Sequence, residues 1–166
     1  MGAATGKAET RAADYLRHPV VLLLIGIWIV NDHFLKDMFG NVLTGKISDF
    51  AGVAVLPLML LGAYESTCAA LSKSPQFRNY VLLGSIFITA FFMAGINLFE
   101  SWASAFRVGL GAAQWPARAV WNYWQNGTSL SAVPVHHTMD PSDLWSLIAL
   151  AFPFWLGRKL EPALES

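Results

Sequence analysis

Four long apolar segments constrain the fold of this chain more than any other feature of its sequence. A helix that crosses a lipid bilayer needs about 20 mainly apolar residues. The segments that approach this length are residues 19–38, 47–65, 79–100 and 142–157. Only 13% of the 166 residues are charged, whereas about 25% are charged in a typical soluble domain. The sequence therefore predicts an all-α fold, an integral membrane bundle of four helices.

Lysine and arginine residues predict the orientation of these helices, because they are enriched in cytoplasmic connections. With four spans, one side carries Lys7, Arg11, Arg17, Lys73, Arg78, Arg158 and Lys159, and the other carries Lys36, Lys46, Arg107 and Arg118. The larger set predicts that both termini are cytoplasmic. We therefore expect an N-terminal stub at residues 1–18, a transmembrane domain at residues 19–158 and a tail at residues 159–166. The long charged leader favours a retained first helix over a cleaved signal peptide.

The connection between the third and fourth segments, residues 101–141, is long and rich in aromatic residues. Its first part, "SWASAFRVGLGAAQWPARAVWNYWQ", mixes tryptophan and tyrosine with arginine, which is typical of helices that lie in a membrane interface. We expect one or two short helices there, with Pro116 in the first turn of a helix. The following "QNGTSLSAVP" predicts a turn and an extended segment.

Polar residues gather at one end of the predicted bundle. They end the first helix, begin the second and precede the fourth, so the threading places all of them at the extracytoplasmic side. The predicted polar pocket comprises Asn31, Asp32, His33, Lys36, Lys46, Ser48, Asp49, Asp140 and Asp143. Asn97 and Glu100 end the third helix at the same level. Ionisable residues inside membrane segments mark binding sites or transport pathways.

Helix capping is the alternative explanation for part of this set. Asp140 can cap the fourth helix, Pro141 suits its first turn, and Asp143 complements the helix dipole. Asp49 can favour a helix start in the same way. A carboxylate at Asp32 has no such explanation, because it lies toward the C-terminal end of its helix.

A metal site is the weaker possibility. His33, His136 and His137 are the candidate ligands, but the last two follow a proline and lack the helical spacing of a zinc-binding helix. The single cysteine, Cys68, excludes a cysteine-rich metal site and an intrachain disulfide framework. The sequence identifies no cofactor.

Three functions fit these residues. The first is a binding or scaffold subunit of a membrane complex. The second is an outer-leaflet enzyme, in which Lys36 and Lys46 hold a lipid phosphate while Asp32 or Asp49 acts with His33 in acid–base catalysis. The third is a small transporter or channel subunit. Expected partners are the bilayer and either further copies or other membrane proteins. The zero net charge does not favour nucleic acid.

The strings "NDHFLK", "LTGKISDFAG" and "DPSDL" resemble a pattern of small, uncharacterised bacterial multi-pass membrane proteins. The resemblance covers the outer ends of three helices. It implies a bacterial inner-membrane location and carries no activity or residue roles. The four-helix layout, with Asp and His at one membrane face, is also loosely similar to VanZ-like proteins, although the VanZ-like motif residues do not align here.

Overall fold

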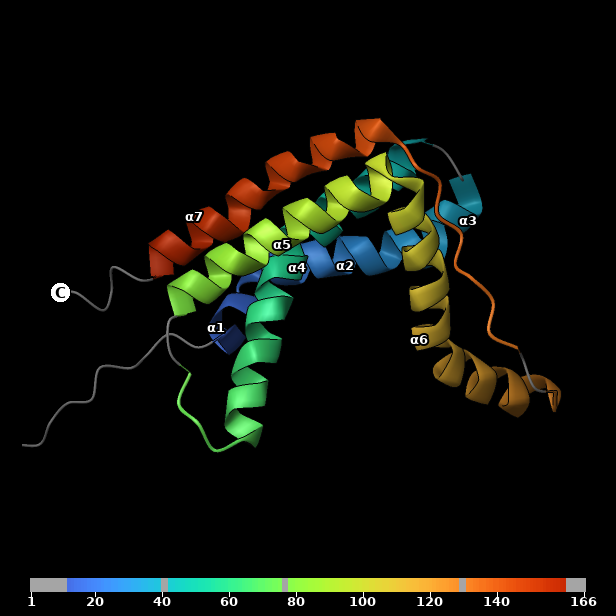
Figure 1. The fold of residues 1–166 in the computed structure, drawn as a ribbon, viewed down its shortest axis with the longest axis horizontal. Coiled ribbons are helices and arrows are strands. Elements are labelled where there is room, and N and C mark those ends of the chain that lie inside the picture. Colours follow the sequence, from blue (N-terminus) through green and yellow to red (C-terminus); the bar gives the residue numbers. More distant parts are fainter. Residues whose placement is uncertain (1–11, 40–41, 76–77, 129–130, 161–166) are drawn as a thin grey trace, which may run out of the picture. The chain divides into compact units, whose positions relative to one another are not determined.

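The computed structural model describes residues 12–39, 42–75, 78–128 and 131–160, and within these ranges it contains helices and connecting segments but no strand (Figure 1). The predicted all-α class is therefore confirmed. The chain divides into two compact units. Unit 1 comprises Met1–Phe91 with Trp145–Ser166, and unit 2 comprises Phe92–Leu144. The boundaries fall within helix α5, Arg78–Leu98, and within the 3-10 helix η2, Pro141–Leu150.

Unit 1 begins with the short helix α1, Ala12–Leu16, followed by the predicted first helix. This helix starts at Pro19, whose missing N–H suits the first turn, and His18 Nδ1 accepts a hydrogen bond from Val20 N at 3.3 Å. It runs through three consecutive elements: α2, Pro19–Val30, the π-helical turn η1, Asn31–Leu35, and α3, Lys36–Phe39. The helix therefore carries Asn31 and Asp32 as the sequence predicts.

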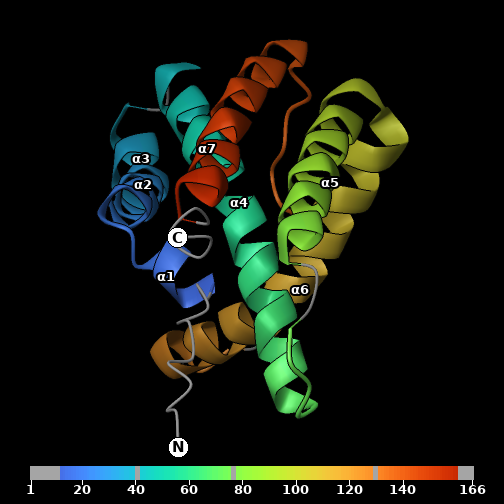
Figure 2. The same ribbon diagram turned by 90° about the vertical axis from the view of Figure 1, so that its left-hand side faces the viewer.

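Helix α4, Val42–Ala70, is the centre of unit 1. It packs against α1, α2 and the last helix, α7, Ala151–Leu160 (Figure 2). Its buried face, including Val55, Leu58 and Leu61, forms the core together with Val21 of α2 and Leu156 of α7. Burying such side chains stabilises a helix pair by about 1.5–3 kcal/mol each in water. The polar turns at both ends of the predicted segment 47–65 continue as helix, which makes α4 longer than expected.

Helix α5 joins this core through Leu82, whose side chain lies against Gly157 of α7. A Cβ atom at Gly157 would lie 2.6 Å from Leu82 Cδ2, so only glycine permits this contact without a shift of Leu82. At the start of α5, the guanidinium of Arg78 pairs with the carboxylate of Glu65 at 2.7 Å. This ion pair fixes the connection between α4 and α5.

Unit 2 is built on α6, Glu100–Asn126. The sequence predicted one or two short helices here with Pro116 at a helix start, and that placement of Pro116 is wrong because it lies inside one 27-residue helix. The helix ends at Gly127, which has the left-handed φ of 66° that glycine adopts most readily. The predicted turn after Asn126 is thus confirmed.

An irregular segment, residues 131–140, returns along α6 within unit 2. Val135 N donates a hydrogen bond to Arg107 O at 3.0 Å. A Cβ atom at Gly111 would lie 2.3 Å from Val133 O and 2.9 Å from Pro134 Cα. Gly111 therefore allows the backbone of the segment to lie directly on the helix.

Two helical stretches are long and apolar enough to cross a membrane, Leu43–Ala70 and Arg78–Leu98, with mean hydropathies of 1.7 and 2.1. Pro19–Val30 is apolar but shorter. Length and composition of two helices give weak support for membrane association. They do not extend to the predicted bundle of four membrane spans.

Candidate functional site

The π-helical turn η1 positions two polar residues at the interface between the first helix and α4. It follows α2 directly, and the N–H of Asn31 bonds to the carbonyls of Ile27 and Trp28. A π turn widens the i→i+4 pattern to i→i+5, and such turns occur frequently at functional sites. The turn brings the consecutive residues Asn31 and Asp32 into one hydrogen-bonded group with Ser48 of α4.

The hydrogen bonds form a chain across this interface. Asn31 Nδ2 donates to the Thr44 carbonyl and to Ser48 Oγ, both at 2.6 Å. Ser48 Oγ in turn donates to Asp32 Oδ1 at 2.5 Å. Asn31, Thr44 and Ser48 are buried. We call Asn31, Asp32, Thr44 and Ser48 the Asn31–Ser48 cluster.

The orientation of the Asn31 amide follows from its partners. A carbonyl oxygen cannot donate, so the atom facing Thr44 O must be the amide nitrogen. The amide oxygen, Oδ1, is consequently directed elsewhere, and no described residue donates a hydrogen bond to it although Asn31 is 0% exposed. A buried acceptor left unsatisfied costs about 1–3 kcal/mol. Such an atom in a native protein needs an explanation, such as a bound water, an ion or another ligand.

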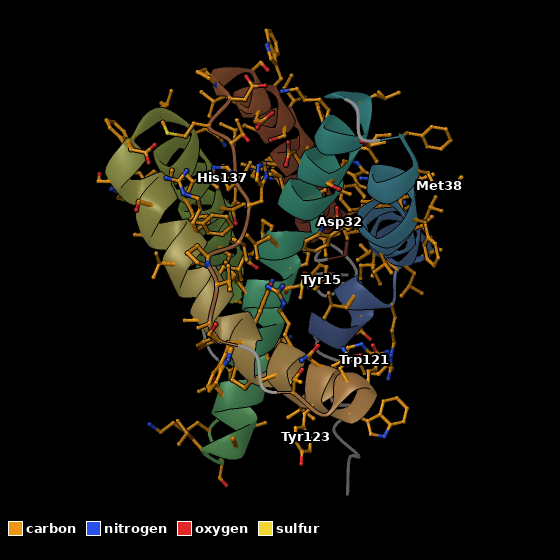
Figure 3. All side chains as sticks on the ribbon, turned by 90° about the vertical axis from the view of Figure 1, so that its right-hand side faces the viewer. Tyr15, Asp32, Met38, Trp121, Tyr123 and His137 are labelled. Atoms are coloured by element: carbon orange, nitrogen blue, oxygen red, sulfur yellow. The ribbon has the colours of Figure 1, made fainter. Side chains whose placement is uncertain are left out.

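Asp32 opens the cluster to the protein surface. Its side chain is exposed and lies beside α4 (Figure 3). Its helical neighbours Ile29, Val30 and Phe34 are large, apolar and also exposed. The carboxylate is thus held by Ser48, and several large apolar side chains of the same helix are exposed close to it in sequence.

For the other predicted site residues of unit 1, the structure describes fewer contacts. The side chains of His33 and Lys36 lie outside the described part of the structure. Lys46 and Asp49 are half-buried on α4, and each has an interaction partner. Lys46 and Asp49 are three residues apart on one helix, which suits an ion pair, and their pairing stays a prediction.

Asp140 and Asp143 belong to unit 2, where Asp140 acts as a helix cap. Its Oδ1 accepts a hydrogen bond from Ser142 N at 2.8 Å, and its carbonyl accepts one from Asp143 N at 2.9 Å. Its own N–H donates to Asn97 Oδ1 at 3.3 Å. These contacts are those of the capping alternative. Their position relative to the Asn31–Ser48 cluster stays a prediction.

His137 holds the returning segment of unit 2 in place. Its Nε2 lies 3.1 Å from Ile96 O, and its ring packs edge-on against Phe106 with ring centres 5.3 Å apart. Arg107 bonds both to the His137 carbonyl at 3.2 Å and to the Glu100 carboxylate. These contacts explain the position of His137 by packing.

The described residues contain no group of three or more His, Cys, Asp or Glu side chains arranged to hold a metal ion. His136 is exposed, and the side chain of His33 is not among those described. A histidine metal site that includes His33 therefore stays a prediction.

Two features of the structure have no counterpart in the residues singled out from the sequence. One is the carbonyl of Thr44, which only the helix–helix contact reveals as a partner of Asn31. The other is an apolar groove of about 740 Å³ in unit 2, lined by Phe92, Trp102, Phe106 and Leu110 among others. No charged side chain lines this groove, so it suits an apolar group. Aromatic residues at helical spacing in α6 were its one signal.

The sequence and the structure of the chain were compared with family models, curated proteins and solved structures. The comparisons found no matching family model, no matching curated protein and no matching solved structure.

Proposed function

We propose that this chain is a multi-pass protein of the bacterial inner membrane and a binding subunit of a membrane complex. Its four spans would place both termini in the cytoplasm. The Asn31–Ser48 cluster would then lie at the extracytoplasmic side and serve as its ligand-binding site.

The surface of unit 1 supports membrane insertion. Leu22 and Leu23 of α2 and Phe87, Ile88 and Phe91 of α5 are exposed although they are large and apolar. Soluble proteins rarely expose large contiguous apolar patches. In a bilayer, the same side chains would contact lipid at no cost.

One observation carries the binding role: Asp32 is exposed, and the buried Asn31 that precedes it has an Oδ1 atom without a described hydrogen-bond donor. A purely structural link between two membrane helices needs only paired groups, and Asn31, Thr44 and Ser48 already provide that link. An ionisable residue in a membrane segment beyond that need suggests a functional site. The Asp32 carboxylate and Asn31 Oδ1 are both oxygen acceptors. They favour a positively charged or hydrogen-bond-donating ligand over a lipid phosphate.

The complex is tested by purification from membranes in a mild detergent, with the polypeptide mass measured by light scattering. We expect a particle well above the 18.2 kDa of one chain. A lone monomer without any co-purifying chain would contradict the proposal.

The orientation is tested on Cys68, the single cysteine, which follows the predicted second span. A membrane-impermeant maleimide should label Cys68 in inside-out vesicles and leave it unlabelled in right-side-out vesicles. The opposite pattern would place the termini and the cluster on the other sides of the membrane. The vesicles must be solubilised in a parallel sample to show that the half-buried thiol reacts at all.

A further inference from the structure

We infer that the apolar groove of unit 2 holds the acyl chain of a membrane lipid. This inference goes beyond the Asn31–Ser48 cluster and shares with the proposed function only the location in a membrane. All residues that line the groove belong to unit 2 and come from the end of α5 and the first half of α6. Its volume of about 740 Å³ lies within the range of pockets that bind small ligands.

The returning segment of unit 2 covers one side of α6 and leaves the groove side open. It lies on Arg107 and Gly111, where Val135 N bonds to the Arg107 carbonyl and the Val133 carbonyl lies against Gly111. Gly109 is two residues from each of these positions and therefore faces about 160° away from them. A Cβ atom at Gly109 would meet no atom within 4 Å. The covered side thus carries a charged residue, whereas the uncovered side carries the apolar groove.

Aromatic contacts fix the walls of the groove. The rings of Phe92 and Phe106 meet edge to face with their centres 5.6 Å apart, and Phe106 also packs against His137. The ring of Trp102 lies directly on Gly95, at a position where a Cβ atom would overlap it. Walls that are already held in place need little ordering when a ligand enters, and this lowers the free-energy cost of binding.

The dimensions of the groove favour a hydrocarbon chain over a protein helix. Its lining follows α6 from Ser101 to Ala113, a length of about 18 Å at 1.5 Å per residue. Over that length the groove volume corresponds to a cross-section of about 40 Å², whereas a helix with side chains, about 10–12 Å wide, needs about twice as much. The small residues Ala105, Gly109 and Ala113 recur along the lining at every fourth position and keep the groove open.

The charges around the groove fit a lipid tail better than a charged molecule. The residues that line the groove are all uncharged. Arg107 and Glu100, on the same part of α6, are paired with each other. A charged group inside the groove would therefore lack a counter-ion, which is costly. The head group of the lipid would stay outside, so we expect binding to depend on the tail and not on the head group.

The chain's own remaining segments suit the groove poorly. The longest stretches outside the described ranges are residues 1–11 and 161–166, and their only large apolar residues are Met1 and Leu164. A groove left empty would lose dispersion contacts along its whole lining. In a membrane, the tails of the surrounding lipids are the molecules that can restore these contacts.

The test measures the lipid that stays bound to the full chain after purification. The protein is reconstituted with phosphatidylcholine that has radiolabelled acyl chains, then extracted and washed in a steroid detergent, which has no alkyl tail to compete. Gly109→Leu should lose most of the lipid that the wild type retains, because its side chain fills the groove while its Cβ meets no atom. Gly84→Leu is the matched control and should retain the wild-type amount, since a Cβ at this glycine of α5 also meets no atom within 4 Å.

A second measurement, on the wild type, keeps the inference testable if Gly109→Leu does not fold. Phosphatidylcholine with a photoreactive group in the middle of its acyl chain should cross-link to residues 101–113. Unlabelled phosphatidylglycerol with the same tails should reduce this cross-linking as well as unlabelled phosphatidylcholine does.

Three results would overturn the inference: full lipid retention by Gly109→Leu, no cross-link to residues 101–113, or a strong preference for one head group. A smaller particle mass for Gly109→Leu with unchanged lipid would overturn it as well, because the groove would then hold a second chain. A lone monomer that retains the lipid would refute the proposed complex and leave the groove site standing. A complex that retains no lipid would do the reverse.

Discussion

The polar residues of the two units differ in what they bond to. In unit 2, Arg107, His137 and Asn97 all reach backbone atoms and hold residues 131–140 in place. In unit 1, Asn31, Ser48 and Asp32 bond to one another's side chains, and Asn31 bonds to the Thr44 carbonyl as well. Both units therefore carry conspicuous polar residues, but only in unit 2 do their described bonds hold a segment without regular secondary structure.

This difference separates scaffolding from binding. A segment without regular secondary structure needs partners for its backbone, and side chains that provide them have a structural role. The two helices joined by the Asn31–Ser48 cluster have their backbone bonds within themselves. Their polar side chains are not needed for that purpose, and one buried acceptor is left over. We therefore look for a polar ligand in unit 1 and assign a structural role to the polar residues of unit 2.

The largest effect is expected where unit 2 depends on close backbone contact. In the Gly111→Val variant, Cβ would meet Val133 O and Pro134 Cα at 2.3 and 2.9 Å. The returning segment would have to leave α6, which should lower the free energy of unfolding by about 3 kcal/mol. Denaturant unfolding in micelles measures this. Gly109→Val is the matched control, because a Cβ there meets no atom within 4 Å. Equal losses in both variants would mean that helix propensity, not the backbone contact, is responsible.

A smaller effect is expected for Ser48→Ala in unit 1. The change removes the hydroxyl between Asn31 and Asp32 and leaves a buried donor and a carboxylate without this partner. The free energy of unfolding should fall by about 2 kcal/mol. Ser66→Ala, on the exposed part of the same helix, should change it by less than about 0.5 kcal/mol. If the two serine variants are equally stable, the cluster does not join the helices and the contrast between the units is lost.

The Asp140 cap of η2 should contribute still less to the free energy of unfolding. Asp140→Ala removes the acceptor of the Ser142 N–H and should cost about 1 kcal/mol, whereas Asp140→Asn retains a good cap and should cost a few tenths. Thermal unfolding of the two variants distinguishes capping from a charge-dependent role. A large loss in Asp140→Asn as well would show that the negative charge itself matters, and Asp140 would return to the ligand-binding candidates.

The smallest effect is expected at the end of α6. Trp124 is 76% exposed and contacts Trp121 with ring centres 5.5 Å apart. Trp124→Ala should therefore change the free energy of unfolding by less than about 0.5 kcal/mol in micelles. Trp102→Ala should cost more, because that ring packs against Gly95. A large loss at Trp124 would show that this end of the helix is covered by a second chain, and unit 2 would then also contain a surface that binds protein.

Much of the helical content follows from apolar periodicity and length, and the first helix from Pro19 is an example. The full length of α4 does not, since residues such as Thr44 and Ser48 resemble a helix start until their contacts with Asn31 are known. The position of Pro116 was predicted wrongly because a proline does not always mark the start of a helix. Proline suits a first turn, but a long helix can lose one hydrogen bond in its interior when the rest of the turn is retained.

The sequence predicted which residues form the candidate site but not how their atoms are arranged. Threading four spans suggested that Asn31, Asp32 and Ser48 share one level, and the structure brings these three together. The π turn could not be foreseen, because "NDHFL" contains no glycine or proline to mark a distortion. Which atom of the Asn31 amide remains unsatisfied depends on the Thr44 carbonyl, and backbone partners across a helix interface have no sequence signature.

The π turn also separates the first helix into two α-helical parts, α2 and α3. Because η1 holds more residues per turn than the α-helix on either side, it takes up one extra residue between α2 and α3. Deleting one residue within residues 31–35 would restore a regular α-helix with little rotation of the residues beyond it. Asn31 and Asp32 are the first two residues of this turn, directly after α2. A shift of this turn along the helix would instead rotate each residue that it passes by about 100°, and such a rotation of Asn31 and Asp32 would take their side chains away from Ser48.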